Sequence, residues 1–312
     1  MKITTWSAYL TRHAIRTFAV LTLLYVVLIF ALPANTQVTQ SYHLRGLDYH
    51  VLLFAINLPS LVVWFAAFYS YSKLYGYARS IPSAPEGKDF KRLADGCAWL
   101  AWSLPAPAII SLVLFAVANN HGGFNGAAVI ITNYSNLLLP LVGFTLIGGA
   151  ARSLVTRAKV RFAANSMRGL VLLFVMIGVL YCYLTFRHLS LGSLGATHNP
   201  YYLPVWLAVL SVIVPYLYAW FVGLLAAYEI SGYSKNVRGL LYRQPLQLLV
   251  GGLITVVTSS VALEYIGVIN PRVGHLVLDY KLLLTLAFRI AGGLGFTLIA
   301  IGANRLKKIE EV

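Results

Sequence analysis

Long apolar stretches separated by short polar segments dominate this sequence and limit what it can fold into. A membrane-spanning helix needs about 20 mostly apolar residues, because each residue adds ~1.5 Å and the hydrocarbon core is ~30 Å thick. Stretches of this kind occupy residues 15–34, 51–75, 97–118, 135–154, 169–187, 203–229, 246–268 and 282–303. They lack the regular alternation of a membrane barrel strand. The sequence therefore predicts an all-α integral membrane protein, a bundle of eight transmembrane helices.

The overall composition excludes a water-soluble domain. Hydrophobic residues make up 59% of the chain and charged residues 11%, whereas a soluble domain has about 25% charged residues. The formal charge of +15 could suggest nucleic-acid binding. However, the basic residues lie in short segments between apolar runs rather than on one polar face. We therefore expect the lipid bilayer, and not nucleic acid, as the surroundings of this chain.

The distribution of the basic residues predicts the orientation. Most of them lie at the N-terminus, in every second loop and in the C-terminal tail: Lys2, Arg12, Arg16, Lys73, Arg79, Lys88, Lys91, Arg92, Arg152, Arg157, Lys159, Arg161, Arg168, Lys235, Arg238, Arg243, Arg305, Lys307 and Lys308. Segments rich in Lys and Arg stay on the cytoplasmic side. The sequence thus predicts a multi-pass protein of the cell membrane with both termini in the cytoplasm.

The two halves of the chain resemble each other. When the chain is slid along itself by half its length, Pro59–Arg79 lies over Pro215–Lys235 and Arg12–Phe30 lies over Arg168–Phe186. At a nearby offset, the sequence Gly-Phe-Thr-Leu-Ile of 143–147 recurs at 295–299. The third and seventh predicted helices match poorly. These matches predict two four-helix repeats, 1–156 and 157–312, which have the same orientation because each has an even number of spans.

Glu264 and Arg289 are ionisable residues inside predicted spans. Such residues are rare in membrane helices and usually mark a pathway or a paired site. Counted at ~1.5 Å per residue, both lie at similar depths on helices joined by a short loop. We expect Arg289 to compensate the charge of Glu264, since a carboxylate beside a cation stays ionised. Whether the pair holds two helices together or binds a substrate or proton stays open.

The repeat also superposes two further pairs of residues. Lys73 and Glu229 occupy equivalent positions, so a cross-repeat ion pair is one expectation; the other is two side chains that extend separately to the interface. Pro59 and Pro215 are equivalent residues within predicted helices. Proline bends a helix, and paired bends could open a cavity toward the outside or only shape the packing.

The sequence shows no convergent set of groups for catalysis, a metal or a cofactor. No two of the seven histidines have metal-ligand spacing on one predicted helix, and Cys97 and Cys182 both lie in apolar segments. Gly292, Gly293 and Gly295 form a small-residue face on the last predicted helix, which suits close helix packing. We expect neither cofactor nor metal, and an enzyme is the least favoured class.

Two classes of function fit these features. The first is a small-solute or ion translocator with its site between the two repeats, where duplicated transporters bind their substrates. The second is a non-transporting membrane subunit, a sensor bundle or scaffold that acts with another membrane protein or as a homo-oligomer. The sequence identifies neither the substrate nor a family.

Overall fold

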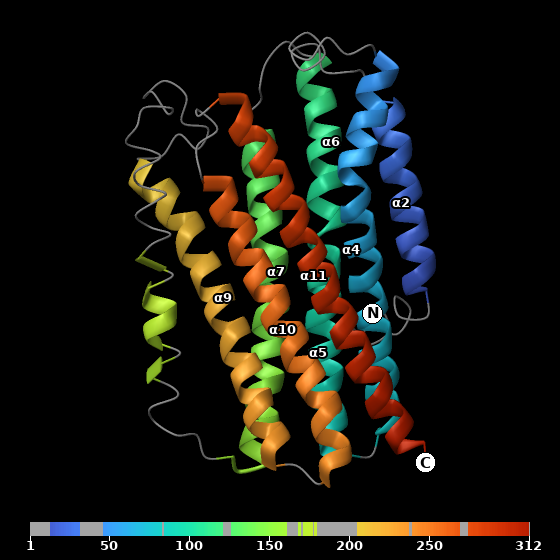
Figure 1. Cartoon of the computed structure of the whole chain (residues 1–312), viewed down its shortest axis with the longest axis vertical. Coiled ribbons are helices and arrows are strands. Elements are labelled where there is room, and N and C mark those ends of the chain that lie inside the picture. The colour runs from blue at the N-terminus through green and yellow to red at the C-terminus, as the bar shows by residue number, and fades with distance from the viewer. Residues whose placement is uncertain are drawn as a thin grey trace.

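The computed structural model of the chain describes residues 13–31, 46–82, 84–120, 126–160, 168–169, 171–176, 178–179, 205–236, 239–268 and 274–311. Its helices are α2 (Ala14–Ala31), α4 (Gly46–Ser80), α5 (Pro85–Trp102), α6 (Pro105–Asn120), α7 (Gly126–Arg157), α9 (Val205–Asn236), α10 (Gly239–Val268) and α11 (Gly274–Glu310). They lie side by side along the long axis of the molecule (Figure 1). The expected all-α class is confirmed for these residues.

Within the described ranges, four helical segments are long and apolar enough to cross a membrane: Pro85–Ile110, Leu137–Arg157, Leu241–Leu263 and Leu283–Glu310. Large apolar side chains on the outside of the bundle are exposed, such as Leu23 (66%), Val62 (62%) and Leu294 (59%). Outward-facing apolar surface on this scale would be unstable in water, whereas lipid tails cover it without cost. These features are those of a multi-pass membrane protein whose helices contact the bilayer.

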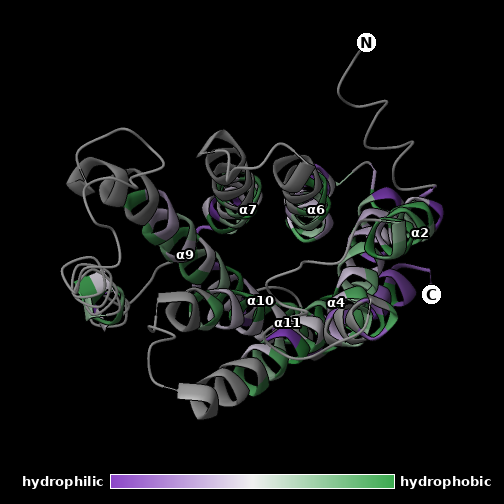
Figure 2. Ribbon diagram, turned by 90° about the horizontal axis from the view of Figure 1, so that it is seen from above, coloured by the Kyte–Doolittle hydropathy of each residue, from purple (hydrophilic) through white to green (hydrophobic). Residues whose placement is uncertain are grey.

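The helices form a closed ring. Contacts run from α4 to α5, then to α7, α9, α10 and α11, and back from α11 to α4. Figure 2, which looks along the bundle, shows α4, α6, α7, α9, α10 and α11 around the ring, with α2 at the edge against α4. The helical segment at 171–176 contacts α9 through Phe174 and Phe221, just as α2 contacts α4. The ring encloses the space in which a central site can form.

One end of the bundle carries a set of basic residues. Four helices that end there have Lys or Arg in their last turn: α4 (Arg79), α7 (Arg157), α9 (Lys235) and α11 (Lys307 and Lys308). We call this the basic end; it is the lower end in Figure 1. Cations in the last turn of a helix are stabilised by its dipole. Packing there is dense, because Leu74, Leu154, Ile230 and Leu306 are each at most 1% exposed.

The prediction of a single helix over 97–118 is wrong. The chain forms α5 from Pro85 to Trp102, turns at 103–104, and continues as α6 from Pro105. Proline cannot donate a backbone hydrogen bond and its ring clashes with the carbonyl four residues earlier. Two prolines, Pro105 and Pro107, follow the turn closely, whereas α4 and α9 contain one proline each and continue. The charged start of α5 escaped the prediction because apolar length alone does not detect an amphipathic helix. Its apolar face is instead buried through Phe90, Leu93 and Cys97.

Contacts recur at positions that the two aligned halves share. Phe18 packs on Phe65 with ring centroids 5.4 Å apart, and Phe174 packs on Phe221 at 4.8 Å. A second recurrence joins α5 to α7 and α10 to α11. A Cβ on Gly96 would lie 2.7 Å from the carbonyl oxygen of Gly143, and a Cβ on Gly252 would lie 2.5 Å from that of Gly295. The glycine contact between α5 and α7 thus recurs between α10 and α11.

Candidate functional site

A cavity of about 480 Å³ lies inside the ring of helices. Side chains from α4, α5, α6, α7, α9, α10 and α11 line it, together with the turn between α5 and α6. Ligand pockets commonly have volumes of roughly 300–1,000 Å³ and a mainly apolar lining with a few polar groups. This lining has that character, with leucine, valine, phenylalanine and tryptophan beside hydroxyl groups and one charged residue. It is therefore the candidate ligand site of the described part of the chain.

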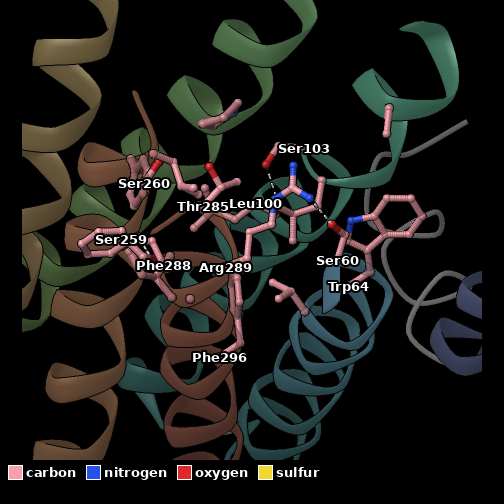
Figure 3. Close-up of a pocket in the computed structure, with 18 of the residues that line it drawn as sticks. Ser60, Trp64, Leu100, Ser103, Ser259, Ser260, Thr285, Phe288, Arg289 and Phe296 are labelled. Carbon is pink, nitrogen blue, oxygen red and sulfur yellow. Dashed lines mark hydrogen bonds between the residues drawn. The ribbon is translucent and has the colours of Figure 1, made fainter. Parts of the chain in front are cut away.

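Arg289 of α11 is the charged residue among the described side chains that line the cavity. Its Nη1 donates a hydrogen bond to Oγ of Ser60 on α4, over 2.6 Å. Figure 3 shows the guanidinium between Ser60 and Ser103, among the lining side chains. A guanidinium has five N–H donors in a planar fork, so one hydroxyl acceptor leaves much of its capacity for other partners.

The turn between α5 and α6 contributes Ser103 to the lining. Its backbone N–H donates to the carbonyl oxygen of Trp99 at 2.9 Å, and its Oγ donates to that of Leu100 at 2.7 Å. These bonds close the end of α5, whose last carbonyls would otherwise lack donors. The helix that Pro105 interrupts is thus capped at the wall of the cavity.

Several lining residues lie at the two offsets at which the halves of the sequence match. Leu100 and Val256, Ser103 and Ser259, and Phe144 and Phe296 all line the cavity. The hydroxyl of Ser259 donates to the carbonyl oxygen of Val256 at 3.0 Å, as that of Ser103 does to Leu100. At the offset of the repeated pentapeptide, Arg289 corresponds to Leu137, which is buried. Three pairs of lining residues thus lie at the offsets of the sequence matches, whereas among the described side chains of the lining the charge lies on Arg289 alone.

The site residues that the sequence predicted lie in different parts of the structure. Arg289 lines the cavity, and Pro59 and Pro215 immediately precede two lining residues, Ser60 and Tyr216. Both α4 and α9 continue as helices through their prolines. Glu264 belongs to α10, but its side chain lies outside the described residues. The expected Glu264–Arg289 pair therefore stays a prediction.

Glu229 does not pair with its equivalent Lys73. Its carboxylate, of which 1% is exposed, instead accepts a hydrogen bond of 2.9 Å from Arg152 of α7. The ammonium group of Lys73 lies 5.1 Å from the ring centroid of Tyr69, one turn earlier on α4. Both residues lie toward the basic end of their helices, away from the cavity lining. The Arg152–Glu229 pair joins α7 to α9 and is a contact between helices, not part of the cavity.

Sequence reasoning missed the hydroxyl groups of the site. Ser60, Ser103 and Ser259 are common residue types in membrane helices, and none has a distinctive motif. Two signals were present: Ser60 follows the repeated proline, and Ser103 and Ser259 are related by half the chain length. Among the described residues, no three His, Cys, Asp or Glu side chains lie together as a metal site would require.

Comparisons with protein-family models, with curated proteins and with solved structures find no match for this chain.

Proposed function

We propose that this chain is a translocator of a small solute or ion in the cell membrane, with its site in the central cavity. In this proposal the chain consists of two parallel four-helix repeats, 1–156 and 157–312, with eight spans and both termini in the cytoplasm. The observation that carries it is the lining of the cavity. Residues at matching positions of the two halves, Ser103 and Ser259 among them, line one space that also holds the partly buried cation of Arg289.

The recurring contacts support the repeat. Gly96 meets Gly143 as Gly252 meets Gly295, and the contact of Phe18 with Phe65 recurs between Phe174 and Phe221. The ring closes through α7–α9 and α11–α4, which are equivalent contacts if the halves are repeats. Parallel repeats related by an axis along the membrane normal occur in transporters, which bind substrates where the repeats meet.

The interrupted helix supports a translocator over a rigid scaffold. Discontinuous helices at membrane depth are tolerated where the irregular backbone lines a cavity, and transporters use them at their binding sites. Here the break at 103–104 lies at the cavity wall through Ser103.

Access to the cavity from both sides of the membrane tests this proposal without knowledge of the substrate. Ser103→Cys and Ser259→Cys are made separately in a chain whose Cys97 and Cys182 are replaced by alanine. Right-side-out and inside-out vesicles are then treated with a membrane-impermeant thiol reagent. Ser70→Cys serves as the unreactive control, because Ser70 is 0% exposed and lies outside the lining.

A translocator must expose its site alternately, so both cavity cysteines should react in both kinds of vesicle. Reaction from one side only, or from neither, would contradict translocation. It would favour the membrane subunit, a sensor bundle or scaffold that acts with a partner protein.

A further inference from the structure

Among the described side chains that line the cavity, the charge lies on one side, on Arg289, and this position indicates what the cavity binds. A cation inside a membrane bundle is costly unless a counter-charge or several acceptors compensate it. The hydrogen bond of Arg289 within the described residues goes to the neutral hydroxyl of Ser60. A hydroxyl satisfies one N–H but does not neutralise the charge. The guanidinium is therefore prepared for an anion.

Oxygen anions match this group in shape as well as in charge. Carboxylate and phosphate accept two parallel hydrogen bonds from a guanidinium, and such pairs are stronger than neutral hydrogen bonds. Thr285 lies one turn before Arg289 on α11 and also lines the cavity, so its hydroxyl can donate to the same anion. The hydroxyl groups of Ser103 and Ser259 already donate to carbonyl oxygens of their own helices. They are therefore not counted as donors to the anion.

The rest of the lining sets the character of the remainder of the ligand. The same lining also contains apolar and aromatic side chains from both halves: Leu100, Val256, Phe144 and Phe296. An apolar body gains free energy by leaving water for such a surface, whereas a second charge would find no described partner there. Arg289 offers one place for the charged group of a ligand. A ligand with one such group therefore binds in one orientation.

We propose that the cavity binds an organic anion, with one carboxylate or phosphate group at Arg289 and an apolar body between the halves. This inference rests on the proposed central site, but it does not require translocation. The same chemistry could come from a water-soluble organic acid or from a single-chain anionic lipid. Each source is one arm of the test.

The test measures thermal unfolding of the full chain in detergent with paired probes at millimolar concentration. Phenylacetate and phenylphosphate are compared with the neutral phenylacetamide. Lysophosphatidate is compared with lysophosphatidylcholine, which has no net charge. Binding to the folded state raises the melting temperature by mass action. We expect the acids, but not their partners, to raise it; a shift with lysophosphatidate alone identifies a lipid ligand.

Variants locate the binding. Arg289→Gln should abolish the shift, which corresponds to a loss of affinity of about tenfold or more, since hydrogen bonds to charged groups contribute about 1.5–3 kcal/mol. Arg289→Lys keeps the charge but not the planar fork, so it should weaken the shift without the risk of misfolding. Arg305→Gln removes a charge from the exposed, basic end of the same helix and should leave the shift unchanged.

Three results would overturn the proposal. One is equal shifts with phenylacetate and phenylacetamide, and another is the absence of a shift with every anionic probe. The third is binding of anions only in Glu264→Gln, because Glu264 would then neutralise Arg289 in the native chain. If anions bind but the cysteines react from one side only, the anion site is retained and translocation is rejected. If the cysteines react from both sides but no anion binds, translocation is retained and the anion site is rejected.

Discussion

Gly252 of α10 faces Gly295 of α11 so closely that neither position has room for a side chain. A Cβ on Gly252 would lie 2.5 Å from the carbonyl oxygen of Gly295, and a Cβ on Gly295 would lie 2.8 Å from that of Gly252. Backbone atoms cannot rotate away as a flexible side chain can. Small residues allow membrane helices to approach in this way, and the close approach fixes the wall of the cavity formed by Val256 and Phe296.

Gly252→Ala should therefore destabilise the protein, although alanine favours helices. Overpacking of this kind costs about 1–3 kcal/mol. The neighbouring Gly251 is a matched control, since a Cβ there would meet nothing within 4 Å. Gly251→Ala should be neutral or stabilising by about 0.5–1 kcal/mol, the difference in helix propensity. Thermal unfolding in detergent measures both; equal melting temperatures would show that the helices can move apart freely.

Equivalent contacts predict equivalent costs in the first half of the chain. Gly96→Ala should lower the melting temperature about as much as Gly252→Ala, because the new Cβ would lie 2.7 Å from the carbonyl oxygen of Gly143. Gly76→Ala is the control, with no atom within 4 Å of the added Cβ. A large loss at Gly252 with none at Gly96 would argue that the halves do not pack as repeats.

Apolar length was sufficient to predict the class of the fold and most of its helices. It underestimated them toward the basic end, where α4 continues to Ser80 and α9 to Asn236. The added turns contain Tyr77 and Tyr233, which are 4% and 7% exposed. These turns are held by tertiary packing rather than by hydropathy, so that a window that measures apolar length does not include them.

The candidate site was predicted only where a residue is unusual in its surroundings. Arg289 was conspicuous because a cation inside a span is rare. The pairing of Glu229 with Arg152 could not be predicted, because it depends on how α7 and α9 meet rather than on a sequence offset. The seryl hydroxyls are distinguished only by the cavity that they face.

The Arg152–Glu229 pair predicts an asymmetric response to the loss of either partner. The side chain of Glu229 is 1% exposed and that of Arg152 is 66% exposed. Arg152→Gln leaves a buried carboxylate without its cation, whereas Glu229→Gln leaves an arginine that water can solvate. Arg152→Gln should therefore reduce stability more than Glu229→Gln does. Urea or thermal unfolding checks this order, with the exposed Arg243→Gln as control; the reverse order would mean that the pair is not the anchor of Glu229.

The hydrogen bond between Arg289 and Ser60 predicts a recovery in a double variant. Ser60→Ala removes the acceptor of a partly buried guanidinium N–H, which costs at most about 1–3 kcal/mol, the cost for a fully buried donor. Ser60→Ala/Arg289→Met removes both partners and should recover most of that loss, while anions should no longer raise the melting temperature. Ser70→Ala is the control on α4, because its hydroxyl bonds only to the carbonyl oxygen of Ala67. Without recovery in the double variant, the two residues are not energetically coupled.

The basic end predicts which side of the membrane each end of the bundle faces. Arg79, Arg157, Lys235 and Lys308 lie in the last turns of four helices that end together. Because segments rich in Lys and Arg remain in the cytoplasm, Lys308→Cys should react with an impermeant thiol reagent only after cells are permeabilised. Leu47→Cys, at the opposite end of α4 where Leu47 is 70% exposed, should react in intact cells. The opposite labelling would invert the orientation, and both cysteines reacting alike would mean that the ends of the bundle do not lie on opposite sides of the membrane.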